Sequence, residues 1–293
     1  MARPWIEDAL QIRDAAKRTA AIERIRQALA SGDPVREFAG LIAFTGSAKA
    51  NFDKAPFRDL ILPLAKGTGG AVRVKAFYAL FNAGMQDGDL DLLLGLADDP
   101  SAEFRSGLSH LIFLFSKGEI TGPAGDRVLA LLRQDDRALV RHALGGIWGA
   151  RVSPAVEERV LALAKDPATR RDAVYFGLST FRDKSAAVVE ALIDALGDPD
   201  SNNSWRALWG LGHGIPRENE GAVADAMLRL FDARGDSGTR TEALRNVGRY
   251  GSSVHLDALG AIASNALAPA DVRSAAGAAA ESIRRRAPGV PGR

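Results

Sequence analysis

Apolar stretches with helical spacing alternate along the chain with short polar turns. VLALLR (128–133) and VVEALIDAL (188–196) are typical of these stretches. Each is followed by a turn signal and then by another helical stretch, so the repeating unit is helix, turn, helix. In the Asp-Pro turns, Asp can cap the next helix and Pro is accepted in its first turn. The turn signals recur about every 30 to 37 residues, as SGDP (31–34), KGTGG (66–70), ADDP (97–100), RQDD (133–136), AKDP (164–167), LGDP (196–199), RGDSG (234–238) and LAPAD (267–271).

The second helices of these units share one ten-residue pattern. Positions one, five, eight and nine fall within about 100° of a helix circumference and hold mainly Val, Ala, Leu, Ile and Gly. One hairpin cannot bury such a face alone, so neighbouring units must stack. The second helices read VREFAGLIAF (from Val35), VRVKAFYALF (Val72), FRSGLSHLIF (Phe104), VRHALGGIWG (Val140), RRDAVYFGLS (Arg170), TRTEALRNVG (Thr239) and VRSAAGAAAE (Val272).

Over residues 20–286 this pattern resembles the short bacterial HEAT-like repeats, the type also found in phycobiliprotein lyases. The resemblance implies an all-α fold, a right-handed α-solenoid of about eight stacked hairpins. We therefore expect a single domain over 1–286, with an N-terminal capping helix at about 4–18 and a flexible tail at 287–293. The family hosts many activities, so the resemblance implies little about function.

Position two of the pattern is mostly arginine. In HEAT-like proteins this residue commonly reaches an aspartate in the turn of an adjacent unit, which implies a structural arginine ladder here. Exposed ion pairs contribute only about 0–1 kcal/mol, so such a ladder would set the alignment of the units more than the stability. The ladder residues are Arg36, Arg73, Arg105, Arg141, Arg171, Arg240 and Arg273, and the available turn aspartates are Asp33, Asp99, Asp136, Asp166, Asp198, Asp236 and Asp271.

The sixth unit, within GDPDSNNSWRALWGLGHG (197–214), fits the pattern in two registers. In the first, Trp205 and Arg206 form the Val-Arg pair, so Trp205 is buried and the ladder is unbroken. In the second, Asn203 is position one, and Ala207 and Gly210 take the small buried positions.

We prefer the second register, in which Ser204 replaces the ladder arginine. Trp205 and Trp209 then occupy positions three and seven, about 200° and 240° around the helix, and face away from the core. The alternative is that this register is wrong, or that the rings pack on one another.

The HEAT resemblance implies that the second helices line a concave face, where positions three and seven would form a discontinuous aromatic strip. Exposed aromatic clusters often mark binding surfaces. Trp148, at position nine, is expected in the core, and Trp5 is expected to cover the N-terminal end. The binding candidates on the strip are Tyr78, His110, His142, Phe176, Trp205, Trp209 and Arg245.

Composition changes this picture little. Hydrophobic residues make up 46% and charged residues 25%, the net charge is +2, and there is no cysteine, which excludes disulfides and thiolate metal sites. Acidic residues appear at Glu7 and Asp8, and the longest apolar run, LIFLF (111–115), is far shorter than the roughly 20 residues of a membrane span. We expect a soluble, cytoplasmic protein that does not bind membranes.

No catalytic motif stands out. The four histidines form no His-Glu pair, so the iron-binding hydroxylases of the HEAT type are not supported, and His110 with His142 would make a weak metal site. We therefore expect a monomeric, non-enzymatic scaffold or adaptor without a cofactor, which binds a protein or peptide. One alternative is a nucleic-acid-binding protein or alkylpurine DNA glycosylase. The other alternative is a bilin lyase-type chaperone. The candidate site residues of the glycosylase would be Trp205, Trp209, Asp172, Arg206 and Arg245.

Overall fold

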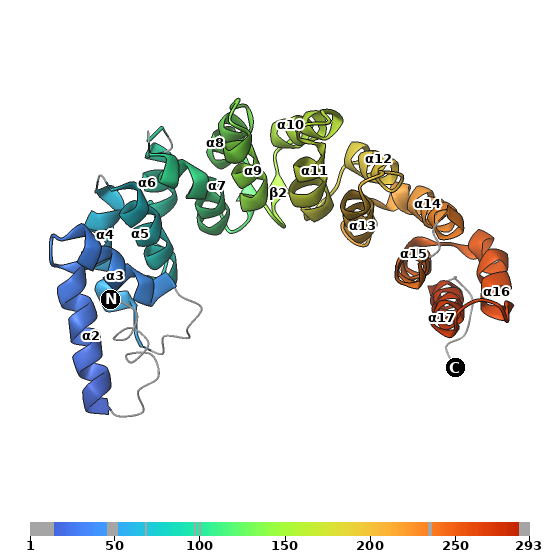
Figure 1. Ribbon diagram of the computed structural model, residues 1–293, viewed down its shortest axis with the longest axis horizontal. Helices are drawn as coiled ribbons and strands as arrows, with labels where there is room; N and C mark the ends of the chain where they lie inside the picture. Colours follow the sequence, from blue (N-terminus) through green and yellow to red (C-terminus); the bar gives the residue numbers. More distant parts are fainter. Residues whose placement is uncertain are drawn as a thin grey trace. The chain divides into compact units, whose positions relative to one another are not determined.

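Helices make up nearly all of the regular structure (Figure 1). The computed structural model describes residues 15–45, 52–67, 69–96, 98–99, 101–233 and 236–286. Within these ranges the only strands are β1 (Glu119–Ile120) and β2 (Arg151–Val152), of two residues each. The all-α class is therefore confirmed. The number of stacked repeats and their handedness stay predictions.

The chain divides into two compact units, residues 1–146 and 147–293. A single domain over 1–286 stays a prediction. Trp5, the tail at 287–293 and nearly all of the expected capping helix at 4–18 lie outside the described residues. No helix among those described is both long and apolar enough to cross a membrane.

In unit 1 the helices pack in pairs, α2 on α3, α4 on α5, α6 on α7 and α8 on α9. The second helices α3, α5, α7 and α9 also pack on one another in that order, which buries aromatic residues such as Phe77 and Phe104. The elements are α2 (Ala15–Leu29), α3 (Pro34–Thr45), η1 (Ala55–Phe57), α4 (Arg58–Lys66), α5 (Gly70–Ala83), α6 (Asp89–Gly95), α7 (Ala102–Phe115), β1, α8 (Gly122–Leu132) and α9 (Arg137–Gly146).

Unit 2 repeats this arrangement: α10 packs on η2, α12 on α13, α14 on α15 and α16 on α17. We call η2, α13, α15 and α17 the row of second helices. The row members contact one another in succession, as the predicted stacking of second helices requires within this unit. The elements are β2, α10 (Pro154–Lys165), α11 (Arg170–Asp172), η2 (Ala173–Gly177), η3 (Leu178–Thr180), α12 (Ala186–Ala195), α13 (Ser201–Gly210), η4 (Arg217–Asn219), α14 (Glu220–Ala233), α15 (Ser237–Tyr250), η5 (Ser253–His255), α16 (Leu256–Ser264) and α17 (Ala270–Arg286).

Only some of the turn aspartates cap the helices that follow them: Asp33 does so in an Asp-Pro turn, as predicted, whereas α7 and α13 are capped by Ser101 and Asp200, which follow the Asp-Pro pairs. Asp33 Oδ1 accepts a hydrogen bond from Val35 N (3.0 Å), and Asp236 Oδ1 accepts one from Thr239 N (2.7 Å). Asp136 Oδ1 accepts from the backbone N–H groups two and three residues later. Each such bond satisfies a helix N–H that has no partner within the helix, and a cap of this kind contributes about 0.5–2 kcal/mol.

The arginine ladder is formed only in part. Arg73 pairs with Asp99 in the next turn, as predicted, and also donates to Gly67 O at the end of the preceding helix. Arg240 and Arg273 instead donate to backbone carbonyls of the preceding helix or turn. Arg36 pairs at 3.7 Å with Asp33 of its own turn. These four residues thus bind carbonyl or carboxylate groups at the turns, whereas Nε of the predicted ladder residue Arg105 is buried without a hydrogen-bond partner among the described residues.

In the fifth unit the buried turn carboxylate is bound by the residue before the predicted one. Arg170 Nε lies 2.7 Å from Asp198 Oδ2, whereas Arg171 lies 3.7 Å from the more exposed Asp200. Arg170 also donates to Ala164 O. Arg171, the predicted ladder residue of this repeat, is thus not the one that binds the buried turn aspartate, because the second helix departs from α-helical geometry at η2.

Candidate functional site

Three of the predicted strip residues lie in unit 1, and the structure joins two of them. Tyr78 and His110 are hydrogen-bonded through Oη and Nδ1 at 2.7 Å, and the His110 ring stacks on Phe113. Burial lowers the pKa of His110 and raises the pKa of Tyr78, because it disfavours the charged form of both groups. His142 is exposed and contributes its backbone carbonyl to a hydrogen bond with Ser109.

Unit 2 holds a denser group, which we call the arginine–aromatic cluster: Trp148, Tyr175, Arg206 and Trp209. The guanidinium carbon of Arg206 lies 3.8 Å from the ring centroid of Tyr175, 5.0 Å from that of Trp148 and 5.7 Å from that of Trp209. The Trp148 ring centroid is 6.1 Å from that of Trp209 and 6.5 Å from that of Tyr175. A cation within about 6 Å of an aromatic centroid is attracted by the ring quadrupole, so the rings hold Arg206 in place.

The sixth-unit register follows from the exposure of these side chains. Trp205 is 48% exposed and Trp209 39% exposed, while Asn203 and Ala207 are buried. The preferred register is confirmed, and the reading in which Trp205 is buried is wrong. The remaining strip residues of unit 2 are Phe176, which is partly exposed, and Arg245, which is exposed.

Polar contacts, two of them buried, fix the helix that carries Arg206 and Trp209. Asp200 Oδ1 caps α13 by accepting from Asn202 N at 2.9 Å. Behind the helix, Ser204 Oγ donates to Leu196 O at 2.7 Å, and Asn203 donates to Asp198 at 3.2 Å. The serine that replaces the ladder arginine therefore ties α13 to the end of α12, so the exposed face of α13 has a fixed orientation.

Trp148 was predicted to be buried, and this prediction was wrong: it is 39% exposed. The buried residues of the fourth helical repeat, to which Trp148 belongs, include Ala143, Gly146 and Ile147. These match Ala207, Gly210 and Leu211 of the sixth repeat. The pattern in the fourth unit thus begins one residue earlier, at Leu139. This shift of the pattern by one residue places Ile147 in the core and Trp148 on the surface.

Tyr175 was not among the predicted binding residues. It lies in η2, a π-helical turn that runs over Ala173–Gly177. A π turn adds one residue to the helix and rotates the residues after it, and such turns frequently occur at functional sites. Tyr175 and the adjacent Phe176 are both partly exposed, with ring centroids 4.7 Å apart, and Tyr175 accepts a hydrogen bond from Arg206 through its hydroxyl. The only sequence signal for it was the presence of two adjacent aromatic residues.

His213 and Lys184 border the cluster. The His213 ring packs edge-on against Trp209 at 4.8 Å between centroids, and Lys184 Nζ donates to His213 O (3.0 Å) and Phe181 O (2.8 Å). Burial lowers the pKa of Lys184 to about 7, and Asp183 opposes this effect. Burial, together with the charges of Lys184 and Arg249, lowers the pKa of His213 to about 4.

We expect acidification to destabilise unit 2 through His213. The unfolded chain binds a proton near pH 6.5, whereas the folded chain binds it only near pH 4, so stability falls as the pH drops through this window. Because the ring is partly exposed, we expect a loss of about 1–2 kcal/mol between about pH 6.5 and pH 4, less than the full shift implies. Urea unfolding of His213→Gln at both pH values should show a smaller loss than the wild type, and an equal loss would exclude His213 as the cause.

The described residues do not form a metal site. No group of three or more His, Asp or Glu side chains among them is arranged to hold a metal ion. Asp172, the acid considered for a glycosylase, lies at the end of α11, next to η2. The chemistry on this surface is that of planar rings, one held guanidinium and hydrogen-bond donors, which favours binding of an anionic and partly apolar group.

No protein-family model matches the sequence, and a search of curated proteins also found no match.

Proposed function

We propose that this protein is a HEAT-like helical-repeat scaffold or adaptor that binds a protein or peptide partner through the arginine–aromatic cluster. The observation that carries the proposal is the position of Arg206, within 6 Å of three aromatic rings, two of which belong to tryptophans that are each 39% exposed. The paired helices and recurring capped turns support the repeat architecture.

Tryptophan, tyrosine and arginine are the residues that dominate the energetics of protein interfaces. Here Tyr175 of η2, Arg206 and Trp209 of α13, and Trp148 lie next to one another. The rings already contact one another, so little side-chain freedom is lost when a partner covers them. This pre-organisation distinguishes the cluster from singly exposed apolar residues such as Leu267.

Arg206 indicates the chemistry of the partner. Its guanidinium carbon lies 3.8 Å from the Tyr175 ring centroid and one N–H group donates to the Tyr175 hydroxyl, while the remaining planar N–H donors suit a carboxylate. The flanking tryptophans offer apolar area for an adjacent side chain. A segment with a carboxylate next to an apolar or aromatic residue matches this arrangement.

The test is a selection of twelve-residue phage-displayed peptides on the wild-type protein, followed by titration of synthetic copies. We expect enriched peptides to combine an acidic and a large apolar residue. Each interface hot spot contributes about 2 kcal/mol or more, so Trp148→Ala/Trp209→Ala should weaken binding by about 100-fold or more.

The matched control is Val254→Ala/Leu267→Ala, which truncates two strongly exposed apolar residues of the same unit outside the cluster. It should bind like the wild type, and circular dichroism should show both double variants folded. Selected peptides that bind the cluster variant with unchanged affinity would contradict the proposal. So would tight binding of a twelve-residue deoxythymidine strand without any selected peptide, since rings beside arginine also suit nucleobases.

A further inference from the structure

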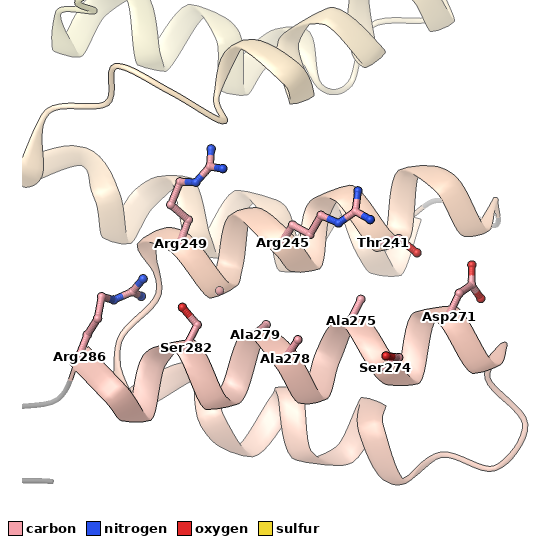
Figure 2. A pocket seen from close by; sticks show the side chains of 11 residues that line it. Thr241, Arg245, Arg249, Asp271, Ser274, Ala275, Ala278, Ala279, Ser282 and Arg286 are labelled. Carbon is pink, nitrogen blue, oxygen red and sulfur yellow. The ribbon is translucent and has the colours of Figure 1, made fainter. Parts of the chain in front are cut away.

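A second surface in unit 2 is a groove between α15 and α17, which run side by side (Figure 2). Its volume is about 600 Å³, within the range of about 300–1,000 Å³ typical of ligand sites. Thr241 and Asp271 lie at one end, and Arg249 and Arg286 lie at the other (Figure 2). We call it the arginine groove.

Three arginines line the groove. Arg245 and Arg249 project from α15, and Arg286 lies at the end of α17 (Figure 2). Arg245 is bound to Glu242 at 2.9 Å, and Arg286 donates to Gly251 O at 3.0 Å. Within the part of the chain that the structure describes, no carboxylate lies within ion-pair distance of Arg249 or Arg286. The end of the groove at these two residues is therefore the part with the most unbalanced positive charge.

The floor of the groove is formed by small residues, Ala275, Ala278 and Ala279 of α17 with Gly248 of α15. A Cβ on Gly248 would lie 2.8 Å from Ala279 Cα, so the two helices are in close contact there. Small side chains between long arginines leave room for a chain to approach the helix backbones while its side chains reach the guanidinium groups.

The groove adjoins the arginine–aromatic cluster at the Arg249 end. A Cβ on Gly212, two residues after the end of α13, would lie 3.3 Å from Arg249 Nη1. The neighbouring His213 packs against Trp209 of the cluster. One extended segment of a partner can therefore contact both surfaces.

We infer that the arginine groove binds an acidic stretch of the partner peptide, next to the residues that the arginine–aromatic cluster holds. This inference rests on the proposed function and adds the charge of the flanking segment. A peptide fits better than a nucleic acid, because Glu242 and Asp271 interrupt the positive charge and unit 2 has almost equal numbers of basic and acidic residues. An evenly charged phosphate chain would meet these carboxylates, whereas carboxylates spaced along a peptide can avoid them.

The experiment measures binding of a fluorescein-labelled peptide of ten glutamates by anisotropy, at about 150 mM salt, where long-range attraction is largely screened. Arg245→Gln/Arg249→Gln should weaken binding about tenfold. The matched control is Arg284→Gln/Arg285→Gln, which removes two exposed arginines of α17 that do not line the groove, one of them also in an ion pair. It should change the affinity less than about twofold, and thermal melts should show both variants folded.

The outcomes separate this inference from the proposed function. Loss of glutamate-peptide binding in the groove variant, with binding retained in Trp148→Ala/Trp209→Ala, supports the inference. Equal losses in both arginine pairs, or no saturable binding by the wild type, overturn it even if the selected peptides still bind the cluster. Tighter binding of a ten-residue deoxythymidine strand that the same groove variant abolishes also overturns it, in favour of nucleic acid.

Discussion

Replacing Arg73 by alanine is expected to lower the free energy of unfolding by about 3–5 kcal/mol. Arg73 is only 4% exposed, and its guanidinium binds both the Asp99 carboxylate and Gly67 O. It also lies 5.3 Å from the Phe104 ring centroid. Truncation leaves a carboxylate and a carbonyl without their donor in a place that water reaches poorly, which costs more than the pair itself contributes.

Arg36→Ala is the matched control, because Arg36 occupies the same position of the repeat. Its side chain is 73% exposed and its pairing with Asp33 spans 3.7 Å, so its loss should cost less than about 0.5 kcal/mol. Guanidinium unfolding followed by circular dichroism compares the two variants. Equal destabilisation would mean that the Arg73 pair is as weakly coupled to folding as an exposed one.

Residue spacing and turn residues together predicted a good part of this structure. The helical class and the exposure of Trp205 and Trp209 follow from residue spacing, since burial on a regular helix repeats every 3.6 residues, whereas the cap at Asp33 follows from the chemistry of its turn. The preferred register of α13 placed Ala207 and Gly210 at the small buried positions, and both are buried. Small residues at the contact positions were the reliable marker, because only they allow two helices to approach closely.

The same rule explains the error at Trp148. Leu139 and Val140 are both apolar, and both are buried, so the start of the pattern in α9 was ambiguous by one residue. Gly146 resolves it: a Cβ there would lie 2.5 Å from His110 N, so this glycine is the contact position. An alignment that places Gly146 at the contact position, instead of starting the pattern at Val140, puts Trp148 on the surface.

Tyr175 could not be placed in this way. The extra residue of the π turn in η2 interrupts the 3.6-residue repeat, and no periodic rule indicates where it occurs. The cluster also joins residues from three successive helical repeats, Trp148, Tyr175 and Arg206, all within unit 2. Their proximity depends on how the units stack, which local sequence patterns do not specify.

Gly210→Val is expected to lower the free energy of unfolding by about 3 kcal/mol, through overpacking. A Cβ on Gly210 would lie 2.6 Å from Ser179 Cα and 2.9 Å from Ser179 O, so the backbone of η3 must move. Trp209 precedes this glycine and contacts Trp148, so tryptophan fluorescence should change together with stability. Denaturant unfolding measures the first effect, and the emission spectrum of the native protein measures the second.

Gly277→Val provides the control for this prediction. Gly277 lies within α17, and a Cβ there would have no neighbouring atom within 4 Å, so valine should change stability by less than about 0.5 kcal/mol. If the two valine variants are equally stable, α13 does not rest on Ser179, and the cluster is not held by the packing beneath it. If Gly210→Val is destabilised but its emission is unchanged, the rings are held by Arg206 and their mutual contacts, and this packing serves stability alone.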